Sequence, residues 1–298
     1  MEKRRLGKTD MYVSVLGFGG AEIGFESATP ETVEKLLNSA LDAGLNLIDT
    51  ASAYLESEIL IGKAAARRRK EYYLLTKCGA TEGFTKADWT EVGILSHIEQ
   101  SLRNLQTDYL DLIQLHSCAE DELRKGDVIK ALQKAREKGY ARYIGYSGDG
   151  EAAKYAVESG AFDTLQTSIS IADQEALDLT LPLAREKGMG VIVKRPVANA
   201  AWRTGQKPEN SYHHEYWERL KKLDYSFLKK DLATAVAIAL RFTLSQPGVH
   251  TAIVGTANPN RWQENAELLE AGLLDHQQIE EIRNRWREVA DKSWVGQV

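Results

Sequence analysis

Short apolar runs typical of β-strands alternate with amphipathic runs typical of α-helices along almost the whole chain, and this alternation restricts the fold more than any other feature. Strands that alternate with helices are expected to lie parallel and to be joined by right-handed crossovers. Eight strand–helix units follow one another within 298 residues. This length and this number of units favour an α/β fold whose sheet closes into a single (β/α)₈ TIM barrel.

Turn and capping signals set the boundaries of the units. A hairpin pattern around residues 7–10 precedes the first unit. The strands are predicted at residues 13–19, 47–51, 72–77, 110–116, 142–147, 164–170, 191–195 and 251–255. The helices are predicted at residues 30–43, 57–68, 90–105, 126–138, 151–158, 174–187, 231–244 and 261–269, with an extra C-terminal helix at residues 276–290.

No stretch rich in Gly, Ser or Pro divides the chain, so we expect one domain over residues 1–298. One connection, residues 198–230, is too long for an ordinary loop. Its aromatic side chains favour a folded segment over a disordered one. We expect a substrate pocket to be shaped by this segment, the loop after His116 and the C-terminal tail. Their tryptophans either form an apolar wall of that pocket or only pack the loops down: Trp202, Trp217 and Trp294.

Charge and composition exclude several classes of protein. The formal net charge is −5, so a nucleic-acid partner is not expected. The N-terminus lacks the apolar stretch of a secretory signal, and no apolar run is long enough to cross a bilayer, so we expect a cytoplasmic protein. Two cysteines, Cys78 and Cys118, make no disulfide framework, and no Cys/His spacing suggests a metal site.

Polar residues end three successive predicted strands. The strand that ends at Asp49 is followed by Tyr54, the next strand ends at Lys77, and the next at His116. In a parallel barrel these strand ends meet at one rim, where barrel enzymes keep their active sites. Each residue also has a structural explanation, as a helix cap, an ion-pair partner or a packing ring. Four such residues at corresponding positions favour a catalytic site over four coincidences.

The chemistry of the four groups indicates proton transfer to an oxygen atom. A buried Lys77 needs a partner, and Asp49 is available. A nearby ammonium stabilises a phenolate, so we expect Lys77 to lower the pKa of Tyr54 below its ordinary value. Tyr54 could then donate a proton to a developing alkoxide while His116 hydrogen-bonds the same oxygen. A proton donor without a metal or a nucleophile suits carbonyl reduction by a hydride cofactor.

At this point the sequence resembles the aldo-keto reductases over essentially its full length. The segments "NLIDTASAY", "LLTKCG" and "LDLIQLHS" are similar to the family's catalytic segments. The resemblance implies a metal-independent, NADP(H)-dependent reductase of aldehydes or ketones. It also implies that Asp49, Tyr54, Lys77 and His116 form the catalytic tetrad, with Tyr54 as proton donor.

The same resemblance implies a binding site for NADP(H). In "YIGYSG", Ser147 would hold the nicotinamide carboxamide, with Gly148 beside it. In "LQTSIS", Gln166 would have the same role. The adenosine 2′-phosphate and the adenine would be bound by the segment "IVGTANPNRWQEN". "GFGG" lacks the spacing of a Rossmann fingerprint and is interpreted as a tight turn under the cofactor. The further expected cofactor residues are Gly20, Asp49, Gly255, Thr256, Arg261, Glu264 and Asn265.

The chain departs from the family pattern at two positions. Lys194 and Arg195 stand where many members carry a tyrosine that stacks on the nicotinamide. Lys194 would flank the nicotinamide and Arg195 contact the pyrophosphate, or both are structural ion-pair partners. Gly255 replaces a lysine often found before the residue that meets the 2′-phosphate. One cation fewer lowers the preference for NADP over NAD, although Arg261 remains.

Two other functions are open at the level of sequence. Some barrels that resemble this one are non-catalytic, NADP(H)-sensing regulatory subunits. An unrelated barrel lyase or isomerase acting on phosphorylated substrates would bind no nicotinamide. We expect a small carbonyl compound as the substrate and a monomer as the oligomeric state.

Overall fold

Eight parallel strands form a closed barrel in the computed structural model, which describes residues 1–297. Around the barrel the strand order is β10-β11-β12-β3-β4-β5-β8-β9, so strands adjacent in the chain are also adjacent in space. The predicted barrel is therefore confirmed. The eight strands are β3 (Leu16–Gly19), β4 (Leu47–Asp49), β5 (Tyr73–Cys78), β8 (Leu110–His116), β9 (Ala141–Ser147), β10 (Thr164–Ser168), β11 (Gly190–Lys194) and β12 (Thr251–Gly255).

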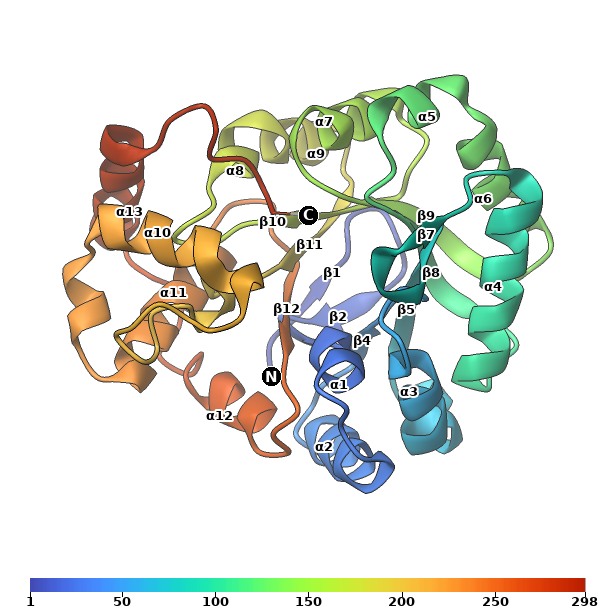
Figure 1. Ribbon diagram of the computed structural model, residues 1–298, viewed down its shortest axis with the longest axis horizontal. Coiled ribbons are helices and arrows are strands. Elements are labelled where there is room, and N and C mark those ends of the chain that lie inside the picture. The colour runs from blue at the N-terminus through green and yellow to red at the C-terminus, as the bar shows by residue number, and fades with distance from the viewer. Residues whose placement is uncertain (298) are drawn as a thin grey trace.

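A ring of helices surrounds the strands (Figure 1). Capping residues begin several of them: Thr29 accepts a hydrogen bond from Thr32 N before the helix that starts with Pro30, as the sequence predicts. The helices are α1 (Ala21–Phe25), α2 (Pro30–Asp42), α3 (Ser57–Ala65), α4 (Glu91–Leu105), α5 (Glu120–Lys125), α6 (Asp127–Glu137), α7 (Gly150–Ser159), α8 (Glu175–Leu179), α9 (Leu181–Glu186), α10 (His214–Leu223), α11 (Leu232–Leu244), α12 (Arg261–Glu267) and α13 (His276–Val289).

An antiparallel hairpin of β1 (Lys3–Arg5) and β2 (Tyr12–Ser14) closes the N-terminal end of the barrel. The turn between its strands packs on the start of β11, where Lys8 N donates to Gly188 O. The hairpin is the predicted one. The predicted strand 13–19 is divided between β2 and β3, because its first part pairs in the hairpin and its second part in the barrel.

The barrel interior is layered because side chains of a strand alternate between its two faces. The lower layer is apolar and is covered from below by hairpin residues Leu6, Met11 and Val13. The strands contribute Leu47, Leu75, Leu112, Ile192 and Ile253 to this layer. Two residues further along each strand, the same inward face carries Asp49, Lys77, Gln114, Lys194 and Gly255. A polar layer therefore lies above an apolar one, toward the C-terminal mouth.

The structure also differs from the predicted elements in places. The predicted helix 174–187 is broken at Thr180 into α8 and α9, because Pro182 has no N–H to continue the helical ladder. Helices α1 and α5 and a short hairpin of β6 (Ala80–Thr81) and β7 (Lys86–Ala87) were not predicted. Residues 198–230 are folded as expected: they contain α10, whose Tyr216, Leu220 and Leu223 are buried.

Within residues 1–297, the helices are all too short or too polar to span a lipid bilayer.

Candidate active site

Lys77 and Asp49 form a buried ion pair in the polar layer of the barrel. Lys77 Nζ lies 2.5 Å from Asp49 Oδ2 and donates a second hydrogen bond of 2.8 Å to Thr50 O. The side chains of Lys77 and Asp49 are 0% and 1% exposed. Burial acts to lower the pKa of Lys77, but the Asp49 carboxylate and the Tyr54 side chain outweigh it and raise that pKa. Lys77 therefore remains a cation at neutral pH.

Asp49 is held by more than its ion pair. Its other oxygen, Oδ1, accepts hydrogen bonds of 2.9 Å from Gln166 Nε2 and 3.4 Å from Gln114 Nε2. Gln166 Oε1 in turn accepts a hydrogen bond of 3.0 Å from Ser147 Oγ. Gln114 was not among the predicted site residues. The period of two that links Leu112, Gln114 and His116 on β8 is the signal that could have identified it.

The segment after β4 holds Tyr54 at the barrel mouth. Ser52 Oγ donates to the carbonyl oxygens of Lys77 and Ala80 at 3.0 and 2.9 Å. Ser57 Oγ donates 2.7 Å to Gly20 O, which ties the start of α3 to the segment after β3. These contacts at both ends fix the position of the Tyr54 backbone.

Tyr54 contacts both of the other polar groups at the mouth. Lys77 Nζ lies 5.1 Å from the centroid of its ring, and a side-chain hydrogen bond with Tyr54 contributes to the raised pKa of Lys77. Burial raises the pKa of Tyr54 above its ordinary value more than Lys77 lowers it. The expectation of a lowered pKa is therefore wrong here, because loss of hydration disfavours the phenolate more than one ammonium favours it. The hydroxyl keeps its proton at neutral pH.

His116 completes the group. Its ring centroid is 5.5 Å from that of Tyr54, with an interplanar angle of 80°. Burial, together with the charges of Lys77, Lys194 and Arg195, places its pKa well below the usual value of 6.5. The imidazole is therefore neutral, and among the described residues its buried Nδ1 has no hydrogen-bond partner.

Three segments turn sharply just beyond these residues. Leu55, Ser117 and Arg195 have φ values of 48°, 55° and 56°, which are uncommon for residues with a side chain. Each directly follows a residue of the mouth: Tyr54, His116 or Lys194. Strained backbone of this kind is frequent at functional sites, where the surrounding structure maintains it.

Lys194 and Arg195 have protein partners in the structure. Lys194 Nζ lies 2.8 Å from Asp149 Oδ2, and burial outweighs this pairing, so the pKa of Lys194 is lowered. Arg195 donates to Tyr212 Oη at 2.8 Å and to Ser168 Oγ at 3.1 Å, and it also contacts the carbonyl oxygen of Gln297 in the tail. The pairing with Asp149, which was not anticipated, fits the ion-pair interpretation for Lys194, whereas these partners of Arg195 are uncharged groups.

The expected cofactor glycines pack closely against other elements. Gly20 N donates 2.8 Å to Asp49 O. A side chain on Gly20 would place its Cβ 2.7 Å from Ser57 Oγ. Gly148 N donates 3.0 Å to Gln166 O, which joins the ends of β9 and β10. Both glycines therefore maintain the shape of the mouth.

The segment expected to meet the adenosine end begins where β12 leaves the barrel. Thr256 Oγ1 accepts a hydrogen bond of 2.9 Å from Asn258 N. Arg261 Nη1 lies 3.0 Å from Glu264 Oε2, and the two side chains are 48% and 50% exposed. Asn265 is half-buried. Arg261 is thus the one cation of this expected set, and it is accessible from solvent.

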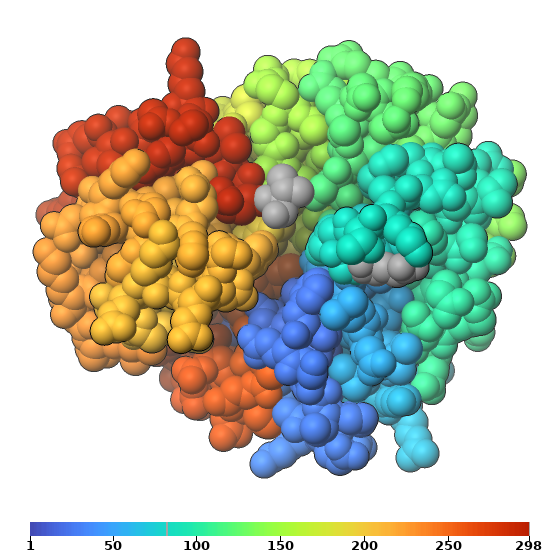
Figure 2. All heavy atoms as spheres, viewed as in Figure 1, coloured from blue at the N-terminus to red at the C-terminus, as the bar shows by residue number. Residues whose placement is uncertain are grey.

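Aromatic rings line one side of the mouth. Phe25 on α1 and Phe84 lie 5.9 and 6.2 Å from the Tyr54 ring, and Phe84 lies 4.8 Å from His116. Phe25 and Phe84 are 46% and 48% exposed. Trp202 and Trp294 are instead buried in the hydrophobic core, so the packing interpretation holds for these two tryptophans. Figure 2 shows a depression near the centre of this face, between α1 and α10.

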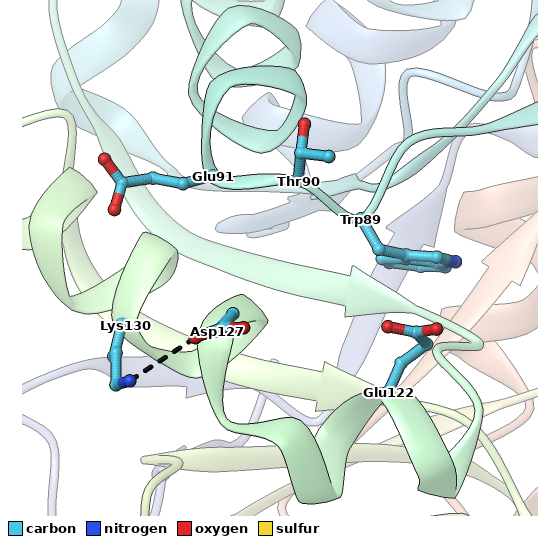
Figure 3. Close-up of a pocket in the computed structure, with 6 residues that line it drawn as sticks. All are labelled: Trp89, Thr90, Glu91, Glu122, Asp127 and Lys130. Carbon is cyan, nitrogen blue, oxygen red and sulfur yellow. Dashed lines mark hydrogen bonds and ion pairs between the residues drawn. The ribbon is translucent and has the colours of Figure 1, made fainter.

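A separate hollow lies outside the barrel mouth, between the start of α4 and helices α5 and α6 (Figure 3). It contains none of the residues discussed above and is lined by Trp89, Thr90, Glu91, Glu122, Asp127 and Lys130. Among the side chains that the structure describes, no three of His, Cys, Asp or Glu lie together as metal ligands would.

The mouth fits a nicotinamide dinucleotide chemically. A carboxamide needs a donor and an acceptor, and the buried Ser147 hydroxyl and Gln166 amide offer both. Phosphates need cations, and Arg195 and Arg261 follow the last two barrel strands. The unpartnered Nδ1 of His116 adds a buried polar group at the same mouth.

Comparison with known proteins identifies relatives over nearly the whole chain. A model of the aldo/keto reductase family matches residues 15–287. The L-galactose dehydrogenase of Arabidopsis thaliana is 28% identical, over 99% of this chain and 97% of that protein. The NADH-specific methylglyoxal reductase of Escherichia coli (strain K12) is 26% identical, over 92% and 95%. The holo form of an aldo-keto reductase from Bacillus halodurans matches with a TM-score of 0.83 and 29% identity, over 96% of both chains.

Proposed function

The chain belongs to the aldo/keto reductase family and is an oxidoreductase, and from this premise we propose that it reduces aldehydes or ketones to alcohols with NADP(H), with Tyr54 as proton donor. The observation that carries the proposal is the convergence of Tyr54 and His116 above the buried Lys77–Asp49 ion pair. The bound nicotinamide would supply the hydride. The residues of the chain then have to deliver a proton and stabilise the substrate oxygen.

Tyr54 is suited to donate the proton. Burial raises its pKa, so the hydroxyl is protonated at the start of a reduction. When the proton leaves, the Lys77 ammonium beside it stabilises the phenolate. Asp49 keeps Lys77 in place and charged. This division of roles makes Tyr54 a general acid in reduction and a general base in alcohol oxidation.

His116 would orient the carbonyl oxygen. Its low pKa keeps the imidazole neutral, so one ring nitrogen carries a proton and donates a hydrogen bond. A neutral donor stabilises developing negative charge on the substrate oxygen without competing with Tyr54 as the acid.

The proposed dinucleotide site extends from the centre of the mouth to β12. Ser147 and Gln166 would hold the nicotinamide carboxamide, with Asp49, Gly20 and Gly148 supporting its surroundings. Lys194 would flank the nicotinamide and Arg195 contact the pyrophosphate. Residues after β12 would hold the adenosine end and, through Arg261, the 2′-phosphate that distinguishes NADP: Gly255, Thr256, Arg261, Glu264 and Asn265.

We also propose that the chain acts as a single domain and a monomer on a small carbonyl substrate. The alternative of a non-catalytic NADP(H)-binding regulatory subunit is less well supported. A binding subunit has no need of a proton donor, yet the chain retains Tyr54 together with the buried pair that stabilises its anion.

The test is turnover with purified protein. NADPH, or NADH in a parallel series, is mixed with a panel of aryl and alkyl aldehydes and ketones, and cofactor oxidation is followed by absorbance. We expect turnover with at least one aldehyde and a higher kcat/KM with NADPH than with NADH. Tight cofactor binding without turnover across the whole panel would support the regulatory alternative instead.

A further inference from the structure

Glu22 on α1 lies against the end of β12 in a way that the sequence did not indicate. Helix α1 begins directly after Gly20 and packs beside β12. A Cβ atom built on Gly255 would lie 1.6 Å from Glu22 Oε2 and 2.5 Å from Oε1. The Glu22 carboxylate therefore occupies the space that a side chain at position 255 would fill.

The surroundings of Glu22 compensate its charge only in part. Among the described residues no side chain donates a hydrogen bond to its carboxylate, and its own backbone N–H is its hydrogen-bonding partner. Burial, with a smaller contribution from Glu26 just after the helix, raises the pKa of Glu22 to about 7, although the backbone hydrogen bond and Arg195 act to lower it. The carboxyl group therefore changes its charge within the ordinary working range of pH.

Glu22 lies close to the loops that follow the last two barrel strands, β11 and β12. Parallel eight-stranded barrels frequently bind phosphate groups with the loops that follow their last two strands. In this chain those loops carry Arg195 after β11, and Thr256 and Arg261 after β12. Glu22 packs on the second loop and acts electrostatically on Arg195 of the first. A phosphate held by these loops would lie near the Glu22 carboxylate.

We propose that Glu22 sets the affinity for the nicotinamide dinucleotide: its ionised carboxylate repels the phosphates, and its protonation removes that repulsion. Binding of the dinucleotide then takes up a proton at Glu22, and affinity falls as pH rises through neutrality. This inference rests on the proposed function, because it requires that a dinucleotide binds at this mouth.

The other groups that face Glu22 are few. Directly after α1 there is Glu26, and after β11 there is Arg195. The end of β12, Val254 and Gly255, has no titratable side chain. The segment before α3 contacts α1 through the backbone carbonyl oxygen of Tyr54. The hydroxyl of Tyr54 has a raised pKa and stays neutral. A change in affinity near pH 7 is therefore assigned to Glu22 by comparing variants at this one position.

The experiment measures dissociation constants for NADPH and NADH by quenching of tryptophan fluorescence between pH 5.5 and 8.5 at constant ionic strength. NADH lacks the 2′-phosphate, which itself titrates, so it isolates the contribution of the protein. For the wild type we expect affinity to weaken about tenfold across this range. Glu22→Gln should bind both dinucleotides about tenfold tighter than the wild type at pH 8.5 and equally at pH 5.5.

If Glu22→Gln does not fold, Glu22→Ala takes its place, because it also removes the charge and should give the same result. Glu34→Gln, an exposed carboxylate on α2 that does not act on Glu22, is the matched control and should keep the wild-type profile. Equal affinities and pH profiles in the wild type and the Glu22 variants would overturn this inference alone. Failure of every variant to bind either dinucleotide at any pH would overturn the proposed function as well.

Discussion

Lys77 Nζ lies 2.5 Å from Asp49 Oδ2 at a depth in the barrel where both side chains are almost completely shielded from water. Two glutamines donate to the other oxygen of Asp49, so the carboxylate is held from three different strands. Desolvation of two charges costs free energy that their attraction repays only when the geometry is good. The pair is therefore better explained by the charge it maintains beside Tyr54 than by a gain in stability.

Removal of one member of this pair should destabilise the protein strongly. Asp49→Asn leaves the Lys77 ammonium buried without a counter-charge, and we expect the free energy of unfolding to fall by about 3–5 kcal/mol. Urea denaturation at pH 7 measures this loss. The exposed pair of Asp127 and Lys130, each 70% exposed, is the control, and Asp127→Asn should cost less than about 1 kcal/mol. Similar losses in both variants would contradict the assignment of Lys77 as a buried cation.

Tyr54→Phe should abolish most of the reaction without affecting cofactor binding. The variant keeps the ring that packs against His116 and loses the proton donor, so we expect kcat to fall about 10²–10⁴-fold. The dissociation constant for NADPH should remain within about twofold of the wild type, since less than 0.5 kcal/mol would change. Tyr155→Phe on α7, which removes a phenol outside the barrel mouth, is the control and should keep the wild-type kcat. Full activity of Tyr54→Phe would remove Tyr54 from the mechanism.

The pH dependence of stability should reveal His116. Its pKa in the folded protein lies well below the ordinary 6.5 of the unfolded chain, mainly because of burial. The neutral ring thus contributes stability above pH 6.5 that is lost as pH falls toward the folded pKa. Denaturation in urea at pH 7.5 and 5.5 should show a larger loss for the wild type than for His116→Gln. An equal loss would show that His116 titrates normally.

Asp173 should make the free energy of unfolding depend on pH in the opposite direction to His116. Burial raises its pKa to about 7, and although Tyr216 donates a hydrogen bond of 3.0 Å to Oδ2, its other oxygen has no partner among the described residues. The unfolded chain ionises this group near 3.8, so its contribution to stability is present below that pH and is lost as pH rises to about 7. Asp173→Asn should lack this part of the slope between pH 5 and 7.5, as urea denaturation at the two pH values would show. Asp127→Asn should keep it, and a wild-type slope in Asp173→Asn would refute the assignment.

Gly24→Ala on α1 should displace the Tyr54 segment and so lower activity. A Cβ at position 24 would lie 2.1 Å from the Tyr54 carbonyl oxygen, so the backbone that carries Tyr54 must move. We expect a loss of about 1–3 kcal/mol in the free energy of unfolding and a clear decrease in kcat. Gly160→Ala, where a side chain meets no atom within 4 Å but φ is +68°, should lower stability alone. An unchanged kcat in Gly24→Ala would show that the Tyr54 segment tolerates displacement.

Much of the architecture could be predicted because it depends on local periodicity. Apolar runs with turn signals located the eight strands, and a carboxylate, an ammonium and an imidazole at strand ends marked one rim. The errors in the fold are also local: Pro182 interrupts a helix, and α1 and α5, of five and six residues, are too short for a helical period to show.

The sequence by itself determined which residues face the barrel mouth, because alternation along a strand places every second side chain on the same face. Only the tertiary structure decided which partners those side chains meet. The hydrogen bond from Gln166 to Asp49, the pairing of Lys194 with Asp149 and the contact of Glu22 with Gly255 each join strands or helices that are distant in the chain. Burial also decided the pKa of Tyr54, because the degree of desolvation depends on how the surrounding elements pack.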